Sequence, residues 1–418
     1  MTAARVLDHA AWLQSGSVAR VLALLNGDGE EARVVGGAVR NALLGVPTGD
    51  IDIATTALPA EVIRRAKGAG IKSVPTGIDH GTVTLVIEAQ PFEVTTLRED
   101  TETFGRKAKV AFGRDWVGDA HRRDFTINAL SVGADGVVHD YVGGLEDIAR
   151  RRVRFIGDPT QRIEEDFLRI LRFFRIHAAF GAGEVDRFGY LACIRSRAGL
   201  STLSAERVRM EILKLLVADG AVGAVAAMAD GGFLQQVFGG VGYTGALAAM
   251  ISAERELGLK ADAIRRLAAL TVAVTEDARR VAVRLRLSKA EAKALDSMGH
   301  RWWRLAGMDE ARARRRLYRL GEDRYRDRLL LAWARAGRDT DPASWRELAL
   351  LPQRWSAPKF PLKAAEFIAR GIAEGPALGH LLTLAEEAWL AADFPLDETT
   401  LAAIADQTVS RFTRDHRL

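Results

Sequence analysis

Two aspartates separated by one residue are the side chains of this chain best suited to bind a metal. Asp50 and Asp52 lie in the segment GDIDI, which is predicted to form a strand. Side chains at positions i and i+2 of a strand point to the same face, so the two carboxylates are expected to lie side by side. Such carboxylates repel each other unless a cation lies between them, and their oxygen atoms favour a divalent metal such as Mg²⁺.

A predicted phosphate-binding turn precedes the two aspartates. Gly36 and Gly37 follow a short apolar strand and precede a helix expected over residues 38–44. Backbone N–H groups and the helix dipole favour phosphate at such a turn, and Arg40 adds a guanidinium that can bind phosphate oxygens. A Gly-Gly pair alone usually marks a packing turn. Together with the Asp-x-Asp motif, within residues 34–53, it indicates nucleotidyl transfer.

Two further segments carry charges whose role the sequence leaves open. Glu93 alternates with apolar residues on the second strand of a hairpin predicted over residues 82–88 and 92–97. It could add a third catalytic carboxylate or could face solvent. Arg123 belongs to the segment DAHRRDFTINAL, where adjacent arginines and aspartates suit a triphosphate or ribose contact. The alternative there is a surface cluster of ion pairs.

Residues 161–180 are predicted to form one helix with an unusual pattern of charges. At about 100° per residue, residues three apart are neighbours on one face. Phe173 and Ile176 fall on the charged side, which favours a half-buried pocket wall over a salt-bridged solvent face. An aspartate beside an arginine offers acceptors and donors that can hydrogen-bond a nucleobase edge. The charged residues recurring every three positions are Asp166, Arg169, Arg172 and Arg175.

Two other helical segments are less specific. Residues 206–216 are predicted to form an amphipathic helix capped by Thr202 or Ser204, with a structural role. Residues 301–330 hold ten arginines against five acidic residues. Interleaved aromatic residues make this segment suitable for phosphate contacts and base stacking, or for a helix pair with a basic solvent face. These aromatic residues are Trp302, Trp303, Tyr318 and Tyr325.

The predicted elements indicate an α+β protein, with a small mixed β-sheet followed by helices only. Helices are expected over residues 4–25 and 58–70, and residues 98–115 are predicted to form a mobile loop. After about residue 158 the strand pattern ends. The 418 residues suffice for two to four domains.

Composition narrows the class of protein. The net charge of +5 and a pI near 9.4 mildly favour a polyanionic partner. The single cysteine, Cys193, excludes a disulfide framework and favours a reducing, cytoplasmic location. Neither a signal peptide nor a membrane span is expected. The eight histidines are scattered and form no hydrolase motif.

Taken together, the motifs resemble those of class II tRNA nucleotidyltransferases, the bacterial CCA-adding enzymes. This family belongs to the DNA polymerase beta nucleotidyltransferase superfamily and includes bacterial poly(A) polymerases. The resemblance implies a catalytic head over residues 1–150, a neck over 151–220, a body over 221–350 and a tail that contacts tRNA over 351–418. The motifs, in order, are VGGAVRNALLG, GDIDIAT, FEVTTLR, RRDFTINAL, Asp140-x-x-Gly-Gly-x-x-Asp147, EEDFLRILRFFR and ERVRMEIL.

The same resemblance implies roles for individual residues. Asp50 and Asp52 match ligands of two Mg²⁺ ions, and Asp166 and Arg169 match residues that read the base edges of CTP and ATP. The tRNA 3′ end is the implied acceptor, and no obligate protein partner is evident. One position departs from the pattern, because Asn41 replaces an aspartate found in many members. Residues matching nucleotide-contacting positions are Gly37, Arg40, Arg123, Arg172 and Arg175.

Three alternatives to CCA addition stay open at this level. The chain could be a poly(A) polymerase, a partial enzyme that adds only CC or only A, or a catalytically silent RNA-binding module. The segment GIDHGTVTLVIEAQPFEVTTLR favours the CCA-adding branch over the poly(A) branch. The presence of Asp50, Asp52 and Arg123 argues against a silent module.

Overall fold

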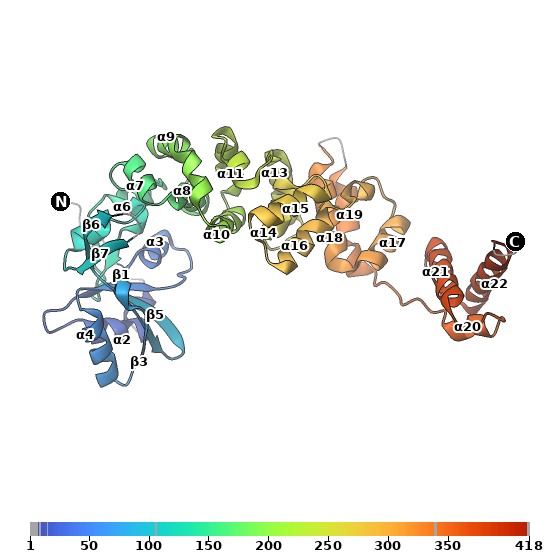
Figure 1. Cartoon of the computed structure of the whole chain (residues 1–418), viewed down its shortest axis with the longest axis horizontal. Helices are drawn as coiled ribbons and strands as arrows, with labels where there is room; N and C mark the ends of the chain where they lie inside the picture. Colours follow the sequence, from blue (N-terminus) through green and yellow to red (C-terminus); the bar gives the residue numbers. More distant parts are fainter. Residues whose placement is uncertain (1–6, 8–9, 15, 105–106, 338–340, 416–418) are drawn as a thin grey trace. The chain divides into compact units, whose positions relative to one another are not determined.

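The chain divides into two compact units, residues 1–240 and residues 241–418. The structure is a computed structural model and describes residue 7 and residues 10–14, 16–104, 107–337 and 341–415. All described strands lie before residue 140 (blue to cyan in Figure 1), and the described remainder is helical. The predicted α+β class is therefore confirmed. The finer division into head, neck, body and tail stays a prediction.

A seven-stranded mixed sheet forms the first part of unit 1, with the strand order β3-β4-β5-β2-β1-β8-β9. Strands β2 and β5 run parallel, and every other neighbouring pair in this sheet is antiparallel. The first strand, β1, is buried along its whole length, as expected for an apolar strand between two neighbours. The strands are β1 (Ala32–Val35), β2 (Asp52–Thr55), β3 (Lys72–Gly77), β4 (Thr82–Ile87), β5 (Gln90–Thr96), β8 (Ser131–Val132) and β9 (Val138–His139).

Short helices alternate along the chain with the strands of this sheet. Pro59 occupies the first turn of α4, as predicted, where its missing N–H is not needed. The helix predicted over residues 4–25 is wrong at its start, because Leu7 and Ala10 are not helical; residues 4–6, 8, 9 and 15 lie outside the described residues. The helices are α1 (Ala11–Gln14), α2 (Gly16–Leu25), α3 (Gly37–Leu44), α4 (Pro59–Gly68), α5 (Trp116–His121) and α6 (Gly144–Ala149), with 3₁₀ turns η1 (Ile78–His80) and η2 (Thr126–Asn128).

The segment predicted to be a mobile loop forms a separate two-stranded sheet instead. Strand β6 (Arg98–Phe104) pairs antiparallel with β7 (Lys107–Phe112). The prediction is wrong because the two strands satisfy each other's backbone N–H and C=O groups. Such pairing does not require an alternation of apolar and polar residues, so the sequence pattern did not reveal it. Strand β3 was missed for a related reason, since it is an edge strand of exposed and half-buried residues that contains Pro75.

The helix predicted over residues 161–180 breaks into two at Asp166. Its backbone is extended, with φ −158° and ψ 106°, and its Oδ1 accepts a hydrogen bond from Leu168 N at 3.1 Å. The side chain therefore competes with the helix and starts a new one. The helices from here to residue 240 are α7 (Pro159–Glu165), α8 (Leu168–Phe180), α9 (Arg187–Ser196), α10 (Ala205–Leu216), α11 (Ala221–Asp230) and α12 (Phe233–Phe238), with a 3₁₀ turn η3 (Arg197–Thr202).

Unit 2 is helical wherever it is described. Its helices are α13 (Thr244–Glu256), α14 (Ala263–Thr271), α15 (Thr275–Arg284), α16 (Lys289–Gly299), α17 (Glu310–Leu320), α18 (Glu322–Arg335), α19 (Pro342–Arg354), α20 (Ala364–Ile368), α21 (Pro376–Ala391) and α22 (Glu398–Asp415), with a 3₁₀ turn η4 (Trp302–Leu305). Among the described residues, no helix combines the length and the apolar character needed to cross a membrane.

The aromatic residues of the basic segment 301–330 mostly serve the core. Tyr325 is fully buried, and Trp302 packs on the same core and donates from Nε1 to Ala273 O at 2.8 Å. Tyr318 packs against Trp389. Base stacking is therefore wrong for Tyr325, and Trp302 and Tyr318 are half-buried against core residues. Trp303 differs, with 48% of its surface exposed.

Candidate active site

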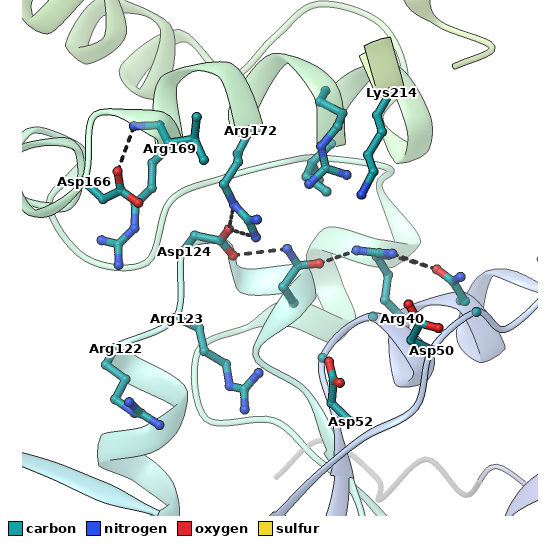
Figure 2. A pocket seen from close by; sticks show the side chains of 18 of the residues that line it. Arg40, Asp50, Asp52, Arg122, Arg123, Asp124, Asp166, Arg169, Arg172 and Lys214 are labelled. Atoms are coloured by element: carbon teal, nitrogen blue, oxygen red, sulfur yellow. Dashed lines mark hydrogen bonds and ion pairs between the residues drawn. The ribbon is translucent and has the colours of Figure 1, made fainter. Parts of the chain in front are cut away.

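A cavity of about 650 Å³ in unit 1 gathers residues from five elements and their connections. Figure 2 shows their side chains converging on one space from the sheet side and the helix side. Seven arginines and one lysine line the cavity, against four aspartates, so it is suited to a polyanion. The lining residues are Gly36, Gly37, Arg40, Asn41, Gly49, Asp50, Asp52, Arg122, Arg123, Asp124, Asn128, Asp166, Leu168, Arg169, Arg172, Arg175, Ile176, Arg207 and Lys214.

The Gly-Gly turn lies where the sequence predicted, between β1 and α3. Gly36 has φ +72° and donates its N–H to Leu130 O at 3.0 Å, which ties the turn to the neighbouring chain segment. A Cβ atom at Gly36 would lie 3.3 Å from Arg123 Nη1, so glycine keeps this arginine close to the turn. Helix α3 begins at Gly37, and its free N-terminal N–H groups favour a bound phosphate.

Arg40 is buried and is held by two asparagines. Its Nη2 and Nε donate to Asn41 Oδ1 at 2.8 and 3.2 Å, and its Nη1 donates to Asn128 Oδ1 at 2.5 Å. The guanidinium carbon lies 3.6 Å from the ring centroid of Phe180, a cation–π contact. Burial, and then the positive charge of Arg175, lower the pKa of Arg40 to about 10, which leaves it charged at neutral pH.

The two aspartates both line the cavity, but they do not share a strand. Strand β2 begins at Asp52, and Asp50 lies in the preceding segment. Ile51 between them is buried while both carboxylates are exposed, so the alternation expected of a strand holds locally. The predicted strand therefore begins two residues too early.

Glu93 is placed beside Asp52 rather than on the cavity wall. The two residues are register partners on the parallel strands β2 and β5. Burial, then Glu93 and Asp50, raise the pKa of Asp52, while Arg123 opposes the shift. Among the residues described, no three His, Cys, Asp or Glu side chains form a metal-binding group. Glu93 thus adds negative charge beside Asp52, and its role as a third catalytic carboxylate stays a prediction.

The donor set of Asp50 and Asp52 fits Mg²⁺. Carboxylate oxygens are its preferred protein ligands, and it usually keeps several positions for water and substrate oxygens, so two carboxylates are sufficient. Burial, and then the negative charges of Glu93 and Asp50, raise the pKa of Asp52, and a bound cation would favour its ionised form.

The segment Arg122–Arg123–Asp124 lines the cavity and is held by two sets of contacts. Arg122 and Arg123 both pair with the buried Asp119, at 2.5 and 3.0 Å, and although burial opposes it, these arginines lower the pKa of Asp119. Asp124 receives a hydrogen bond from Arg172 Nε at 2.7 Å and another from Asn128 Nδ2 at 3.1 Å. Figure 2 shows the bond from Arg172 to Asp124, and the chain of bonds continues through Asn128 to Arg40.

Asp166 and Arg169 both reach the cavity, but they are not partners. Asp166 Oδ2 pairs with Arg207 Nη2 at 2.6 Å. Arg169 Nη1 pairs with Glu165 at 2.5 Å and donates to Arg162 O at 2.8 Å. The predicted face of one continuous helix is therefore wrong, and separate anchors orient the two side chains.

Helix α10 contributes residues that the sequence did not single out. It was predicted to be structural, and Ser204 caps it as expected, accepting from Arg207 N at 3.4 Å. Arg207 and Lys214 nevertheless line the cavity, and Glu211 pairs with Arg175. Their spacing of three to four residues places them on one helix face. This spacing is the sequence feature from which a charged face of α10 could have been predicted.

Comparisons with known proteins agree with this geometry. Residues 32–154 match the poly A polymerase head domain, and residues 191–241 match a probable RNA and SrmB-binding site of polymerase A. The chain is 31% identical over 396 residues to mitochondrial CCA tRNA nucleotidyltransferase 1 of Mus musculus, covering 91% of this chain and 88% of the relative. It is also 31% identical over 372 residues to the CCA-adding enzyme of Limosilactobacillus fermentum, covering 87% and 89%.

A solved structure shows the same architecture. The CCA-adding enzyme of Bacillus stearothermophilus in complex with CTP superposes with a TM-score of 0.70 at 25% identity, covering 94% of this chain and 98% of that one. The identity and coverage of the two relatives above establish the family, and the predicted resemblance is confirmed. This chain belongs to the CCA tRNA nucleotidyltransferases, the CCA-adding enzymes.

Proposed function

We propose that this chain adds C and A residues from CTP and ATP to the 3′ end of tRNA and releases pyrophosphate. The observation that carries the proposal is the convergence of the Gly-Gly turn, Asp50 and Asp52, and the Asp166 and Arg169 side chains on one cavity. The first two groups suit transfer of a nucleotidyl group, and the third suits recognition of a base without a template. The CCA-adding enzyme of Bacillus stearothermophilus was solved with CTP, and the mouse relative is named as a CCA tRNA nucleotidyltransferase, which supports the same substrates.

The reaction is an in-line attack of the tRNA 3′-hydroxyl on the α-phosphate. Asp50 and Asp52 would hold Mg²⁺, which when bound lowers the pKa of the hydroxyl and neutralises charge on the leaving group. The Gly36–Gly37 turn and Arg40 bind and orient the triphosphate. Arg123, fixed by Asp119, stands beside the turn and stabilises the negative charge that develops there.

Base selection belongs to the opposite wall of the cavity. Asp166 is held by Arg207, so its remaining acceptor positions have a fixed direction. Arg169, anchored by Glu165, offers further donors. A fixed acceptor next to fixed donors can bond the edge of cytosine or adenine.

We propose that the body of the tRNA contacts a basic surface of unit 2. A cavity of about 630 Å³ there is lined by five arginines and Glu387. Arg304, Arg315 and Arg316 have no carboxylate partner among the described residues, and burial followed by neighbouring arginines lowers the pKa of Arg316. Unbalanced guanidinium charge of this kind suits an RNA phosphate backbone. The five arginines are Arg304, Arg312, Arg315, Arg316 and Arg319.

Incorporation of labelled CTP and ATP, tested separately, decides among the candidate activities. The acceptors are tRNAs that end before the first C or after CC, and an unrelated RNA oligomer. A CCA-adding enzyme extends the first tRNA with C and the second with A, and leaves the oligomer unchanged. Extension of the oligomer with A indicates a poly(A) polymerase, and activity with only one tRNA indicates a partial enzyme. A cytoplasmic location stays a prediction, because the mouse relative is named as mitochondrial.

A further inference from the structure

The cations that line the active-site cavity fall into two groups. Six of the seven arginines pair with a carboxylate. Arg40 and Lys214 have no carboxylate partner among the residues that the structure describes. The paired arginines are Arg122 and Arg123 with Asp119, Arg169 with Glu165, Arg172 with Asp124, Arg175 with Glu211, and Arg207 with Asp166.

Arg40 differs from Lys214 because it is fixed in place. Three of its N–H groups bond to the amide oxygens of Asn41 and Asn128, and one face of the guanidinium lies on Phe180. Only 8% of its surface is exposed. All of the contacting groups are neutral, so they set the direction of the guanidinium, and Asp124 acts on it only through its charge, without a contact.

A buried charge with neutral partners gains more from a bound anion than one already paired. The guanidinium is already largely desolvated before the ligand arrives, and the amide oxygens supply only dipoles. An arginine that already has a carboxylate must share its donors with the incoming phosphate. Among the described arginines of this cavity, Arg40 therefore offers the most unbalanced positive charge to a triphosphate.

We propose that Asn41 and Asn128 are positioning residues that hold Arg40 without a carboxylate contact, and that the amide at position 41 sets the affinity of the cavity for polyphosphate. This deepens the proposed function, because it concerns the nucleotide site of that reaction. Asn41 also donates to Pro47 O at 2.9 Å, which keeps its Oδ1 turned toward Arg40.

Position 41 is the better place for a test. Asn128 donates to Asp124, so a carboxylate there would face another carboxylate and disturb the fold. Asn41→Asp and Asn41→Ala both lose the bond to Pro47, but only the aspartate adds a charge next to Arg40. Gln235→Glu makes the same amide-to-carboxylate change at an exposed position of α12 that does not line the cavity.

The experiment measures binding of inorganic tripolyphosphate and of CTP by calorimetry, without acceptor RNA. Asn41→Asp is expected to weaken both by about tenfold, which corresponds to ~1.4 kcal/mol. We expect Asn41→Ala to lose no more than about threefold, and Gln235→Glu to bind like the wild type. The difference between the Asp and Ala variants should narrow as salt is added. In incorporation assays, Asn41→Asp raises KM for CTP with little change in kcat.

Three outcomes would overturn the proposal. One is equal affinity of the Asp and Ala variants for tripolyphosphate. The second is failure of Asn41→Asp to fold, because a carboxylate beside a buried guanidinium should be accommodated. The third is a wild-type chain that does not bind tripolyphosphate. A wild type that binds tripolyphosphate and still incorporates no nucleotide would contradict the proposed function alone.

Discussion

Asp52 and Glu93 are register partners on the parallel strands β2 and β5, so two carboxylates stand side by side at the edge of the cavity. Their proximity contributes to the raised pKa of Asp52. We predict that Glu93→Gln lowers this pKa, so that the acidic limb of the incorporation rate moves to lower pH. A rate profile against pH checks this. Glu184→Gln, an exposed change away from the cavity, should leave the limb in place.

The same pair predicts a change in stability. A carboxyl group whose pKa is raised by folding adds stability below its ordinary value of 3.8, and this stability is lost as the pH rises through the folded value. Glu93→Gln should therefore raise Tm at pH 7 in the presence of a chelator, with no gain from this pair below pH 3.8. A Tm at pH 7 equal to that of the wild type would contradict the coupling between the two groups.

Removing the metal-binding carboxylates is expected to stop the reaction and spare tRNA binding. Asp50→Ala and Asp52→Ala should each lower incorporation on the order of a thousandfold, because charge stabilisation at the phosphates is lost. Asp79→Ala, at an exposed 3₁₀ turn, serves as the control. Chelation of divalent ions should have the same effect on the wild type, reversed by added Mg²⁺. Incorporation that persists in the double variant would refute the metal assignment.

Arg207 is predicted to control base selection through Asp166. Its replacement by alanine frees the Asp166 carboxylate from the ion pair at 2.6 Å. We expect KM for CTP and ATP to rise about tenfold and misincorporation of other nucleotides to increase. The reason is that the Asp166 carboxylate is no longer held in the direction that bonds the base edge. Kinetics with all four nucleotides measure this. The exposed Arg195→Ala is the matched control, and a variant that loses only thermal stability would show that the pair is structural.

The β6–β7 hairpin is expected to affect the switch from C to A addition. Deleting residues 103–112 would remove all of β7 and leave β6 unpaired, so a shorter cut is cleaner. Asp100 and Val110 face each other, and replacing residues 101–109 by Asn-Gly closes the hairpin with a tight turn. C addition should be kept and A addition impaired. Equal loss of both activities, assayed on the two tRNA acceptors, would contradict this hypothesis.

Arg315 and Arg316 are predicted to bind RNA phosphates without sequence preference. Their double replacement by alanine should weaken tRNA binding and reduce the slope of log affinity against log salt by roughly 0.9 for each duplex phosphate lost. A salt titration of tRNA affinity checks this. Arg346→Ala, an exposed change elsewhere in unit 2, should keep the wild-type slope. An unchanged slope in the double variant would remove these residues from the RNA contact.

The sequence by itself determined the chemistry of the cavity, because that chemistry depends on local features. The Gly-Gly turn, Arg40 and the two aspartates lie within residues 34–53, where one strand-to-helix turn and one strand start bring them together. The predicted division between a sheet-containing first part and a helical remainder also holds, since hydrophobic periodicity is a local property.

Only the tertiary structure decided how charges from distant segments pair. Asp166 breaks the predicted helix and meets Arg207 from α10, and Asn128 joins Arg40 to Asp124 across the cavity. A single sequence shows the charge of each side chain but not the partner, because pairing depends on how helices pack in space. Whether Arg40 is balanced by a carboxylate or held by two amides is a property of that packing, and it sets the charge that a nucleotide meets.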